Sequence, residues 1–497
     1  MTGMFLPSLR RVALLSSAAA FVFGLHASAA WAGDLPATPD GAAKVAAAFK
    51  TYGGVDADVK ADGKAYLVSY AFTAPASLMG SAQTLKFDPI KVDLKIFAQD
   101  DGGWRVEVAG LPPITAKGTI DGDPVAETVT LSGFKKSVVY DPAIFGPRSG
   151  GFSADKVLIA VTSPRLNENV EVSGFKGSVT GAAGAGGTLT TAVHESGDGF
   201  TFKLSADPKE PAKPGAAKEP IEVTGKGGAT SGDFKADGLK SKALADLWAF
   251  MIAHPQRADL AANEPAFKAL LTSAAAGTPT FASTFQGDAY AFSTAKGAVT
   301  FDKAGGAFGL GENGPQSHFE ERFKFSGISL SEGLVPPLYK DIVPTSVDIG
   351  VKISGFDLSA AAQEWIADIK LAGDGPWLAK DDSDKVSAKL TGAGPIAIEI
   401  PTSHLVSPVL DVTIDGRADY QVGGKPVGKF TIRIRNFDKS VEALNTLGPE
   451  AQQKLVPMLA MAKGLGKADG DSLVWVCELG ADRVMKVNGL PLGKAPI

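Results

Sequence analysis

The chain has 497 residues, with 49 basic and 54 acidic side chains and a formal net charge of −5. A mildly acidic chain with interspersed charges lacks the basic footprint of a nucleic-acid-binding protein and is poorly suited to anionic lipid head groups. The 58 glycines are typical of a turn-rich β protein, and the length favours two domains over a single core.

The first 32 residues have the pattern of a secretory signal peptide. Arg10 and Arg11 precede an apolar segment over residues 12–25, and we favour the small-residue cleavage pattern that ends at Ala32. An uncleaved membrane anchor is the alternative, although this apolar segment is short for a bilayer span. We therefore expect export to the periplasm and no transmembrane span after cleavage. The formal charge of residues 33–497 would be −7, because two arginines are lost.

Residues 33–205 are expected to form an N-terminal β-rich lobe. It begins with a helix over residues 41–52, for which Asp40 is the expected N-cap and Gly53-Gly54 the stop. Residues 91–96 and 104–108 alternate in polarity and flank a turn at 100–103, which predicts a hairpin with one polar side. Strands are expected over residues 65–71, 84–97, 127–131, 156–162, 170–172, 187–193 and 200–205, with a glycine-rich hairpin loop at 181–187.

A short pattern recurs at the ends of the expected strands: a small or polar residue, then glycine, then an apolar residue. Glycine permits a positive φ or a bulge, so we expect the strand to bend there and turn the next side chain into the core. A ligand-lining role for these apolar residues is the alternative. The copies are Ser132-Gly133-Phe134, Ser173-Gly174-Phe175, Ser326-Gly327-Ile328, Ser354-Gly355-Phe356, Ala109-Gly110-Leu111, Asp237-Gly238-Leu239 and Asn488-Gly489-Leu490.

Residues 206–220 contain four prolines among lysines and glutamates, which predicts a linker or long loop. A helical connector is expected over 221–280, with helices at 244–252 and 263–276. Residues 281–497 are expected to form a C-terminal β-rich lobe. Its helices are expected at 359–370 and at 439–465, with a break at 448–449. Its strands are expected over 290–293, 298–302, 322–326, 346–353, 386–390, 396–400, 410–414, 420–422, 429–434, 472–479 and 483–487.

These elements together predict a β-dominated α+β fold. We expect large curved antiparallel sheets in two lobes, with helices packed on or in them, including one in the concavity of a sheet. The only cysteine, Cys477, is expected on the face that carries Leu473, Trp475 and Leu479. A buried, unreactive thiol is favoured there over a nucleophile or an intermolecular bridge.

Motifs that would carry catalysis or hold a cofactor are missing from the sequence. Residues 309–314 match G-x-G-x-x-G, but the strand before and helix after that a phosphate site needs are not predicted, so a loop is favoured. His318 and Glu320 share a face if the segment is a strand, and a solvated edge is favoured over a metal or acid-base site. Ser403 and His404 are adjacent, which is not the geometry of a triad.

We therefore expect no catalytic, no cofactor-binding and no metal-ligating residues, and a non-enzymatic activity. There is no G-x-S-x-G turn, and no S-x-x-K with its companion motifs. The question of an enzyme stays open, because a glycosidase needs only two carboxylates that face each other across a cleft.

The signal peptide, the Ser-Gly-Phe strand ends and the segment Leu334 to Tyr339 together resemble an uncharacterised family of periplasmic proteins from alphaproteobacteria, known as a domain of unknown function. The tail is similar too, with a helix, the strand 473–479 and then 487–491. The resemblance lends no catalytic residues. The style of the strands also looks like that of AsmA-like envelope proteins, whose curved β-grooves imply lipid traffic by architectural analogy alone.

The leading expectation is a periplasmic protein that binds a hydrophobic or lipid envelope ligand, or that scaffolds envelope assembly with a protein partner. The alternative is a cell-wall glycan-binding protein or glycan-active enzyme. That alternative would require a cleft with two carboxylates beside an exposed Trp104, Trp365 or Trp377. The oligomeric state does not follow from the sequence.

Overall fold

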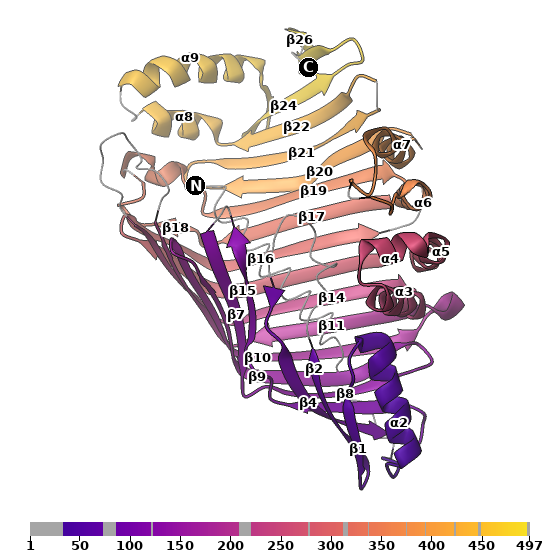
Figure 1. The fold of residues 1–497 in the computed structure, drawn as a ribbon. Helices are drawn as coiled ribbons and strands as arrows, with labels where there is room; N and C mark the ends of the chain where they lie inside the picture. Colours follow the sequence, from indigo (N-terminus) through magenta and orange to yellow (C-terminus); the bar gives the residue numbers. More distant parts are fainter. Residues whose placement is uncertain are drawn as a thin grey trace. The chain divides into compact units, whose positions relative to one another are not determined.

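The computed structural model describes residues 33–72, 86–120, 123–207, 220–276, 279–311, 317–335, 337–373, 375–392, 394–421, 424–445 and 449–494. The chain clusters into two compact units that are interleaved in sequence. Unit 1 comprises the residues up to Pro164 together with Glu171–Gly197 and Asp233–Ala274, and unit 2 comprises Arg165–Val170, Asp198–Gly232 and Ala275–Ile497. Each unit is an antiparallel sheet with helices packed on it, which confirms the predicted β-dominated α+β class (Figure 1).

The expected signal peptide, residues 1–32, and most of the expected linker, 208–219, lie outside the described residues. The division at 206–220 therefore stays a prediction. The helices of the expected connector, 221–280, belong to unit 1.

Unit 1 has a sheet in which β2 pairs with β1 and β4, β5 with β4 and β8, and β9 with β8, β7 and β10. The predicted hairpin of residues 91–96 and 104–108 is β4 paired with β5. The strands of this unit are β1 (Asp58–Asp62), β2 (Ala65–Phe72), β3 (Lys86–Phe87), β4 (Ile90–Ala98), β5 (Trp104–Ala109), β6 (Ile114–Ile120), β7 (Asp123–Ser132), β8 (Lys135–Asp141), β9 (Gly146–Thr162), β11 (Leu189–Gly197) and most of β10 (Leu166–Ala183) and β14 (Thr230–Leu239).

A crease crosses the sheet of unit 1 where neighbouring strands break off side by side. The breaks lie between β3 and β4, at the end of β5 and at the end of β7. The single strand expected over 84–97 is wrong: it is β3 and β4, separated at Asp88-Pro89, where proline has no N–H for the ladder. β5 stops before Gly110 and β7 before Gly133, whose φ angles are +98° and +64°. Phe134 is buried at the crease in an apolar cluster with Val92, Val108, Leu111 and Ala154.

The recurrent glycine pattern has the expected backbone angle in both units, but Gly174 lies inside β10 rather than at its end, and only some of the following side chains are buried. All seven of its glycines have positive φ, between 59° and 98°: Gly110, Gly133, Gly174, Gly238, Gly327, Gly355 and Gly489. The following side chain is buried at Leu111, Phe134 and Phe356. Leu490 is a correction, because it follows Gly489 in the C-terminal hairpin and is 54% exposed.

The first helix begins earlier than expected. It is α2 (Pro39–Ala48), followed by the π-turn η1 (Phe49–Gly53), and its N-cap is Thr38 rather than Asp40. The Thr38 side chain accepts a hydrogen bond from the Gly41 N–H at 3.1 Å, while proline occupies the first helical position. The expected stop is confirmed, since Gly54 has φ +63°.

The predicted helix pair of unit 1 is present with one addition. The helices are α3 (Ser241–Ala253), α4 (Arg257–Ala262), which was not predicted, and α5 (Glu264–Ala275). Trp248 of α3 donates its indole N–H to the carbonyl of Tyr52 at 2.8 Å, which ties α3 to the turn after α2. The hairpin loop predicted at 181–187 lies between β10 and β11 but is shorter than expected, because residues 181–183 still pair with β11 as part of β10.

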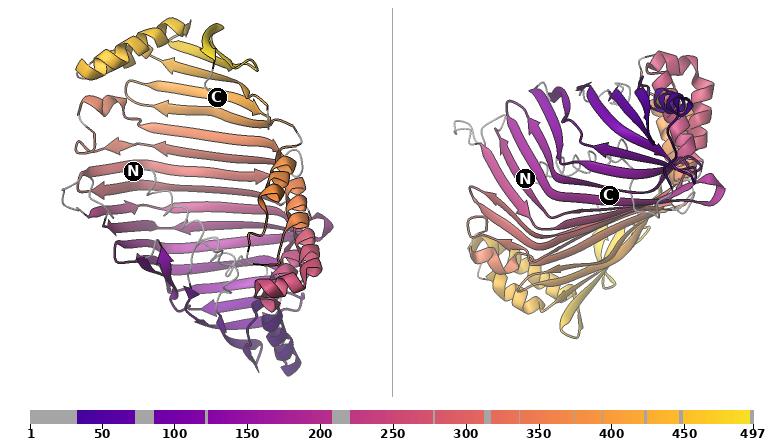
Figure 2. Two further views of the ribbon diagram at one scale, coloured as in Figure 1. Left: turned by 45° about the horizontal axis from the view of Figure 1, so that its top comes forward. Right: turned by 90° about the horizontal axis from the view of Figure 1, so that it is seen from below.

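Unit 2 is a long antiparallel meander in which each strand pairs with the next in the order β12, β13, β15, β16, β17, β19, β20, β21, β22, β24, β25, β26. Its strands twist and curve (Figure 2). Their bounds are β12 (Gly199–Ala206), β13 (Ile221–Gly227), β15 (Thr280–Thr294), β16 (Gly297–Gly311), β17 (Ser317–Ser326), β18 (Ser329–Leu330), β19 (Ser346–Phe356), β20 (Ile396–Val406), β21 (Asp411–Tyr420), β22 (Val427–Arg435), β23 (Lys467–Asp469), β24 (Ser472–Leu479), β25 (Val484–Val487) and β26 (Leu490–Lys494).

The helices of unit 2 lie at the margins of this sheet. Figure 1 shows α6 (Leu358–Asp368) and α7 (Lys380–Thr391) at one end of the strands, and α8 (Phe437–Asn445) and α9 (Pro449–Leu465) near β22 and β24. A short 3₁₀ helix, η5 (Pro337–Ile342), precedes β19. The predicted helix over 359–370 and the broken helix over 439–465 are both confirmed.

The strand expected over 386–390 is wrong, because these residues belong to α7. Val386 and Leu390 alternate with Ser387 and Lys389, but they also stand four residues apart, which suits a helix equally well. Asp381 and Asp382 in the first turn and Lys389 in the last complement the helix dipole.

Asn488 joins the C-terminal hairpin to the end of α9. Its amide donates to the carbonyls of Leu465 and Val474 at 2.7 and 2.8 Å, and its side-chain oxygen accepts from the Val476 N–H at 3.0 Å. Its φ is +50°, a left-handed angle that asparagine tolerates better than most residues.

We expect Asn488→Ala to destabilise unit 2 by about 2–4 kcal/mol, because it removes three hydrogen bonds and places alanine at positive φ. Thermal unfolding and hydrogen exchange in the last turn of α9 would measure the loss. Lys486→Ala, an exposed change on the preceding strand β25, is the control and should change stability by less than about 0.5 kcal/mol. Equal stability of the two variants would contradict this role of Asn488.

Candidate functional site

The register of unit 2 aligns apolar side chains into rows that cross many strands. Residues directly opposite each other in paired strands point to the same face of a sheet. One such row runs through Phe285, Gly306, Phe323 and Ile349 on β15, β16, β17 and β19. Phe285 and Phe323 have ring centroids 6.5 Å apart, and the Phe285 ring covers Gly306, where an added Cβ would lie 2.4 Å from it.

Further rows extend the same face across the meander. Both rows are traced through the Cα partners of neighbouring strands. On β15 to β19, one row lies four residues along the strands from the first row, and the other lies two residues from it in the opposite direction. The longer reads Phe281, Leu310, Phe319, Ile353, Ile398, Ala418, Gly428, Leu479 and Met485, and the other reads Ala304, Phe325, Val347, Leu405, Val412, Ile434 and Leu473. We call the face that these rows form on β15–β24 the apolar face.

The apolar face is open to solvent over its middle strands. Every exposed large hydrophobic side chain on the described strands β15–β21 belongs to it, and Phe285 and Ile349 are 50% and 49% exposed. These side chains are Phe285, Phe308, Phe323, Ile349, Ile398 and Tyr420. Isolated apolar residues are common on protein surfaces, but a contiguous group on one face indicates a binding surface.

The opposite face of the same strands is charged. The row displaced by one residue along each strand from the long apolar row contains only charged residues: Glu320, Lys352, Glu399, Arg417, Lys429, Glu478 and Lys486. Arg417 pairs with Glu399 at 2.7 Å, and Lys429 pairs with Glu478 at 3.1 Å. This face is therefore the solvated side of the sheet. A sheet with one solvated face usually has its other face packed on a core, so the exposure of the apolar face requires an explanation.

At the C-terminal end the apolar face is covered by helix. Phe437 of α8 and Leu459 of α9 pack on Trp475, whose indole N–H donates to the carbonyl of Ala462 at 2.7 Å. Cys477 belongs to this cluster, and burial raises the pKa of its thiol. Its predicted face is confirmed, but the thiol is half-buried rather than fully buried as expected.

Aromatic contacts carry the apolar surface back from β17 to β12. Phe325 contacts Phe301 at 5.5 Å between ring centroids, Phe301 contacts Phe292 at 6.5 Å, and Phe292 contacts Phe202 at 6.5 Å. The rings lie over Gly225 of β13, where an added Cβ would stand 2.7 Å from Phe292. Rings that cover strand glycines keep this part of the sheet closely packed.

One carboxylate interrupts the apolar face. Glu321 lies opposite Phe308 on β16 and Val351 on β19, between Phe319 and Phe323 of its own strand. It is half-buried, and it makes no hydrogen bond or ion pair with any residue that the structure describes. Its neighbours in sequence behave differently, since Arg322 points to the opposite face and pairs with Asp348 at 2.6 Å.

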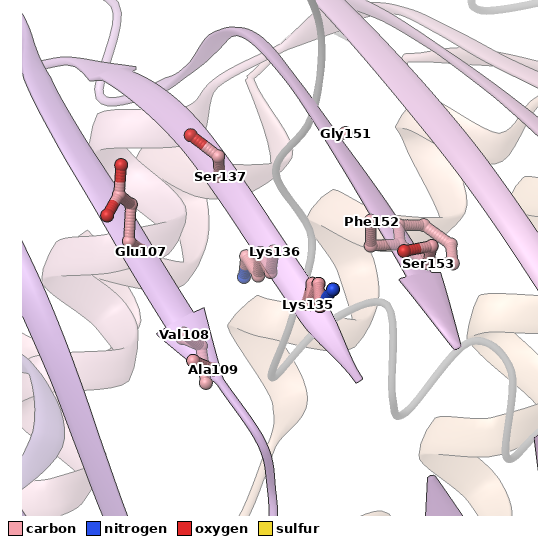
Figure 3. Close-up of a pocket in the computed structure, with 9 residues that line it drawn as sticks. All are labelled: Glu107, Val108, Ala109, Lys135, Lys136, Ser137, Gly151, Phe152 and Ser153. Atoms are coloured by element: carbon pink, nitrogen blue, oxygen red, sulfur yellow. The ribbon is translucent and has the colours of Figure 1, made fainter. Parts of the chain in front are cut away.

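Unit 1 contains a cavity of about 400 Å³ where β5, β8 and β9 reach the crease (Figure 3). Figure 3 shows Lys135 and Lys136 at the start of β8, between the end of β5 and Phe152-Ser153 of β9. Its lining residues are Glu107, Val108, Ala109, Lys135, Lys136, Ser137, Gly151, Phe152 and Ser153. The carboxylate of Glu107 is already paired with Arg105, which leaves a mixed lining without a convergent set of polar groups.

Lys136 belongs to an apolar row of unit 1, opposite Val108 and Phe152. Its side chain is only 9% exposed, and burial lowers its pKa to about 8. Desolvation disfavours the charged ammonium, and this is the cause of the lowered pKa.

The residues singled out in the sequence are not brought together into a catalytic or metal site. His318 and Glu320 do share a strand face on β17, and the described residues contain no cluster of His, Cys, Asp or Glu that could hold a metal ion. Ser403 is buried and accepts a hydrogen bond from the Gly350 N–H at 3.2 Å, a structural role. Gly309 to Gly311 of the expected loop are the last residues of β16, which corrects that expectation, and residues 312–316 lie outside the described part.

Of the tryptophans that the glycan alternative would need beside two carboxylates, only Trp377 is exposed, and its carbonyl accepts from the N–H of Lys370, whose ammonium pairs with Asp382 at 2.6 Å. Trp104 is packed in the core of unit 1 against Tyr66, with ring centroids 6.1 Å apart. Trp365 is half-buried in α6, and Trp377 is exposed in the loop before α7.

Comparison with protein families gives one match. The model of the family described as "Uncharacterized protein conserved in bacteria (DUF2125)" matches residues 216–496, more than half of the chain. The chain belongs to this family. The match includes strands β15–β24 and therefore the whole apolar face. No curated protein and no solved structure matches, so the likeness to AsmA-like proteins stays a prediction. None of the described helices is long and apolar enough to cross a bilayer.

Proposed function

We propose that this DUF2125 protein is a non-enzymatic protein of the bacterial cell envelope that binds the aliphatic chain of a lipid on its apolar face. The observation that carries the proposal is the gathering of Phe285, Phe308, Phe323, Ile349, Ile398 and Tyr420 on one face of β15–β21, all exposed. The hydrophobic effect favours covering such a surface by roughly 25 cal/mol for each Å² of apolar area removed from water.

The dimensions of this surface suit an extended hydrocarbon chain. Six neighbouring strands, from β15 to β21 without the short β18, contribute exposed side chains to it. Adjacent strands lie about 4.8 Å apart, so a row across them spans roughly 24 Å. Each buried methylene contributes about 0.8 kcal/mol, so a chain of lipid length laid along one row would bind without any polar contact.

The scarcity of hydrogen-bonding groups favours a lipid over a protein or a glycan. Specific protein interfaces make about one hydrogen bond for each 100–200 Å² of buried surface. Between β15 and β21 the rows of the apolar face offer the side chains of Ser283, Glu321 and Tyr420, whereas Ser403 is already bonded within the sheet. A hydrocarbon chain needs no such partners.

Export to the periplasm through a cleaved signal peptide is part of the proposal. Asp34, two residues beyond the expected cleavage site, is held by Arg105 at 2.5 Å, so a chain that starts at Gly33 would keep this anchor. We expect the protein from a periplasmic fraction to have the intact mass of residues 33–497. The mass of the uncleaved chain would overturn this part of the proposal.

Native mass spectrometry of gently purified protein, followed by lipid extraction, tests the proposed activity. We expect a reproducible lipid adduct at fixed stoichiometry that organic extraction releases. A measured mass equal to that of the chain without any adduct, together with failure to take up added lipid, would contradict lipid binding. It would favour the alternative that the protein is a scaffold for envelope assembly.

A further inference from the structure

We infer that the ligand of the apolar face carries a protonated amine, and that Glu321 is the residue that binds it. This inference rests on the proposed function and names the class of ligand: an amphiphile with an ammonium group next to its hydrocarbon chain. The inference is based on the carboxylate of Glu321, which has no partner among the described residues and lies within a face that otherwise exposes hydrocarbon.

Glu321 would be costly to cover with a ligand that cannot pair with its carboxylate. Covering the apolar face with a hydrocarbon chain would bury the carboxylate beside Phe308 and Val351, and a buried charge must be paired to be tolerated. An ionised carboxylate is an acceptor only, so its complement is a group with N–H or O–H donors. An ammonium supplies both the donors and the opposite charge.

The rings around Glu321 favour a cation independently of the carboxylate. Phe319 and Phe323 flank it on β17, and Phe308 lies directly opposite on β16. Phe308 and Phe319 meet edge to face, with ring centroids 5.3 Å apart. The faces of aromatic rings attract cations, and rings arranged around an anion are a known way to hold an ammonium group.

A metal ion is a poorer occupant of this position. Calcium and magnesium take six or more oxygen ligands, and Glu321 has only apolar residues in the neighbouring positions of its face. An anionic head group would be repelled by the carboxylate. The chemistry therefore selects a positively charged head on an aliphatic chain.

The test compares three probes of equal chain length on the full chain: decylammonium, decanol and decanoate, each below the concentration at which it forms micelles. Isothermal titration calorimetry should give decylammonium about tenfold tighter binding than decanol, and decanoate the weakest binding. In Glu321→Gln the advantage of decylammonium over decanol should vanish, because decylammonium loses its ion pair and decanol no longer buries an unpaired charge. Glu321→Met should behave likewise and serves if the first variant folds poorly.

Glu320→Gln is the matched control, because Glu320 is the adjacent carboxylate and lies on the charged face. It should leave the ranking of the three probes unchanged. Equal binding of decylammonium and decanol by the unaltered protein, or an equal effect of Glu320→Gln, would overturn the inference and leave the proposed function intact. Failure of all three probes to bind would overturn both.

Discussion

Phe285→Asp is expected to lower the affinity for an acyl chain at least about tenfold. Phe285 is half exposed on β15, the first strand of the apolar face, and its ring contacts Phe323 across Gly306. The variant removes hydrocarbon contact area and places a carboxylate where a bound chain would desolvate it. Burying an unpaired charge costs several kcal/mol, and each 1.4 kcal/mol corresponds to a factor of ten in affinity.

Thr284→Asp provides the matched control for this experiment. Thr284 precedes Phe285 on β15 and is exposed on the opposite face. An aspartate at this position therefore adds the same charge without touching the apolar face. Displacement of a fluorescent fatty-acyl probe would measure both variants. We expect Thr284→Asp to bind as the unaltered protein does, within about twofold. Equal losses in the two variants would show that the apolar face is not the binding surface.

Lys136→Met is expected to stabilise unit 1 by about 1–3 kcal/mol at pH 7. The pKa of Lys136 is about 8 in the fold, below its usual 10.5. The unfolded chain therefore binds more protons between pH 8 and pH 10.5, and stability rises with pH across that window. Below pH 8 the full cost of burying the ammonium is present, at about 1.4 kcal/mol for each pKa unit, and methionine avoids it.

The pH dependence distinguishes this account of Lys136 from simple repacking. The stabilisation by Lys136→Met should shrink as the pH is raised from 7 to 10, because the unaltered lysine becomes neutral in the fold. Urea unfolding, followed by hydrogen-exchange labelling of β8, would measure it. Lys135→Met, an exposed change at the preceding position, should have little effect. A Lys136→Met variant that is less stable at both pH values would contradict the prediction.

Local chemistry made parts of this fold predictable from the sequence. The glycine tripeptides predicted positive φ at positions such as Gly133 and Gly355, because no other residue adopts that angle at so little cost. The hairpin of β4 and β5 followed from its strict alternation and its Asp-Gly turn. The face of Cys477 followed from alternation alone, since Trp475 and Leu479 share its parity.

The apolar face could not be predicted because it depends on register between strands. β16 contains Gly305, Gly306, Gly309 and Gly311, which lower its strand propensity, so only residues 298–302 were expected to be extended. The alternation of Phe319, Glu321, Phe323 and Phe325 was a usable signal within one strand. Its continuation through β20 depends on an irregularity between Ile400 and Ser403 that exchanges the faces, and no local pattern marks such a shift.

Photo-crosslinking with a diazirine-bearing fatty alcohol, followed by peptide mapping, would show directly where a hydrocarbon chain binds. We expect adducts on Phe285, Phe323, Ile349 and Ile398 of the apolar face, which excess unlabelled fatty alcohol removes. We expect none on their neighbours on the opposite face, such as Thr284 and Lys324. Adducts that avoid the apolar face, or that lie equally on both faces of β15–β21, would contradict lipid binding on the apolar face.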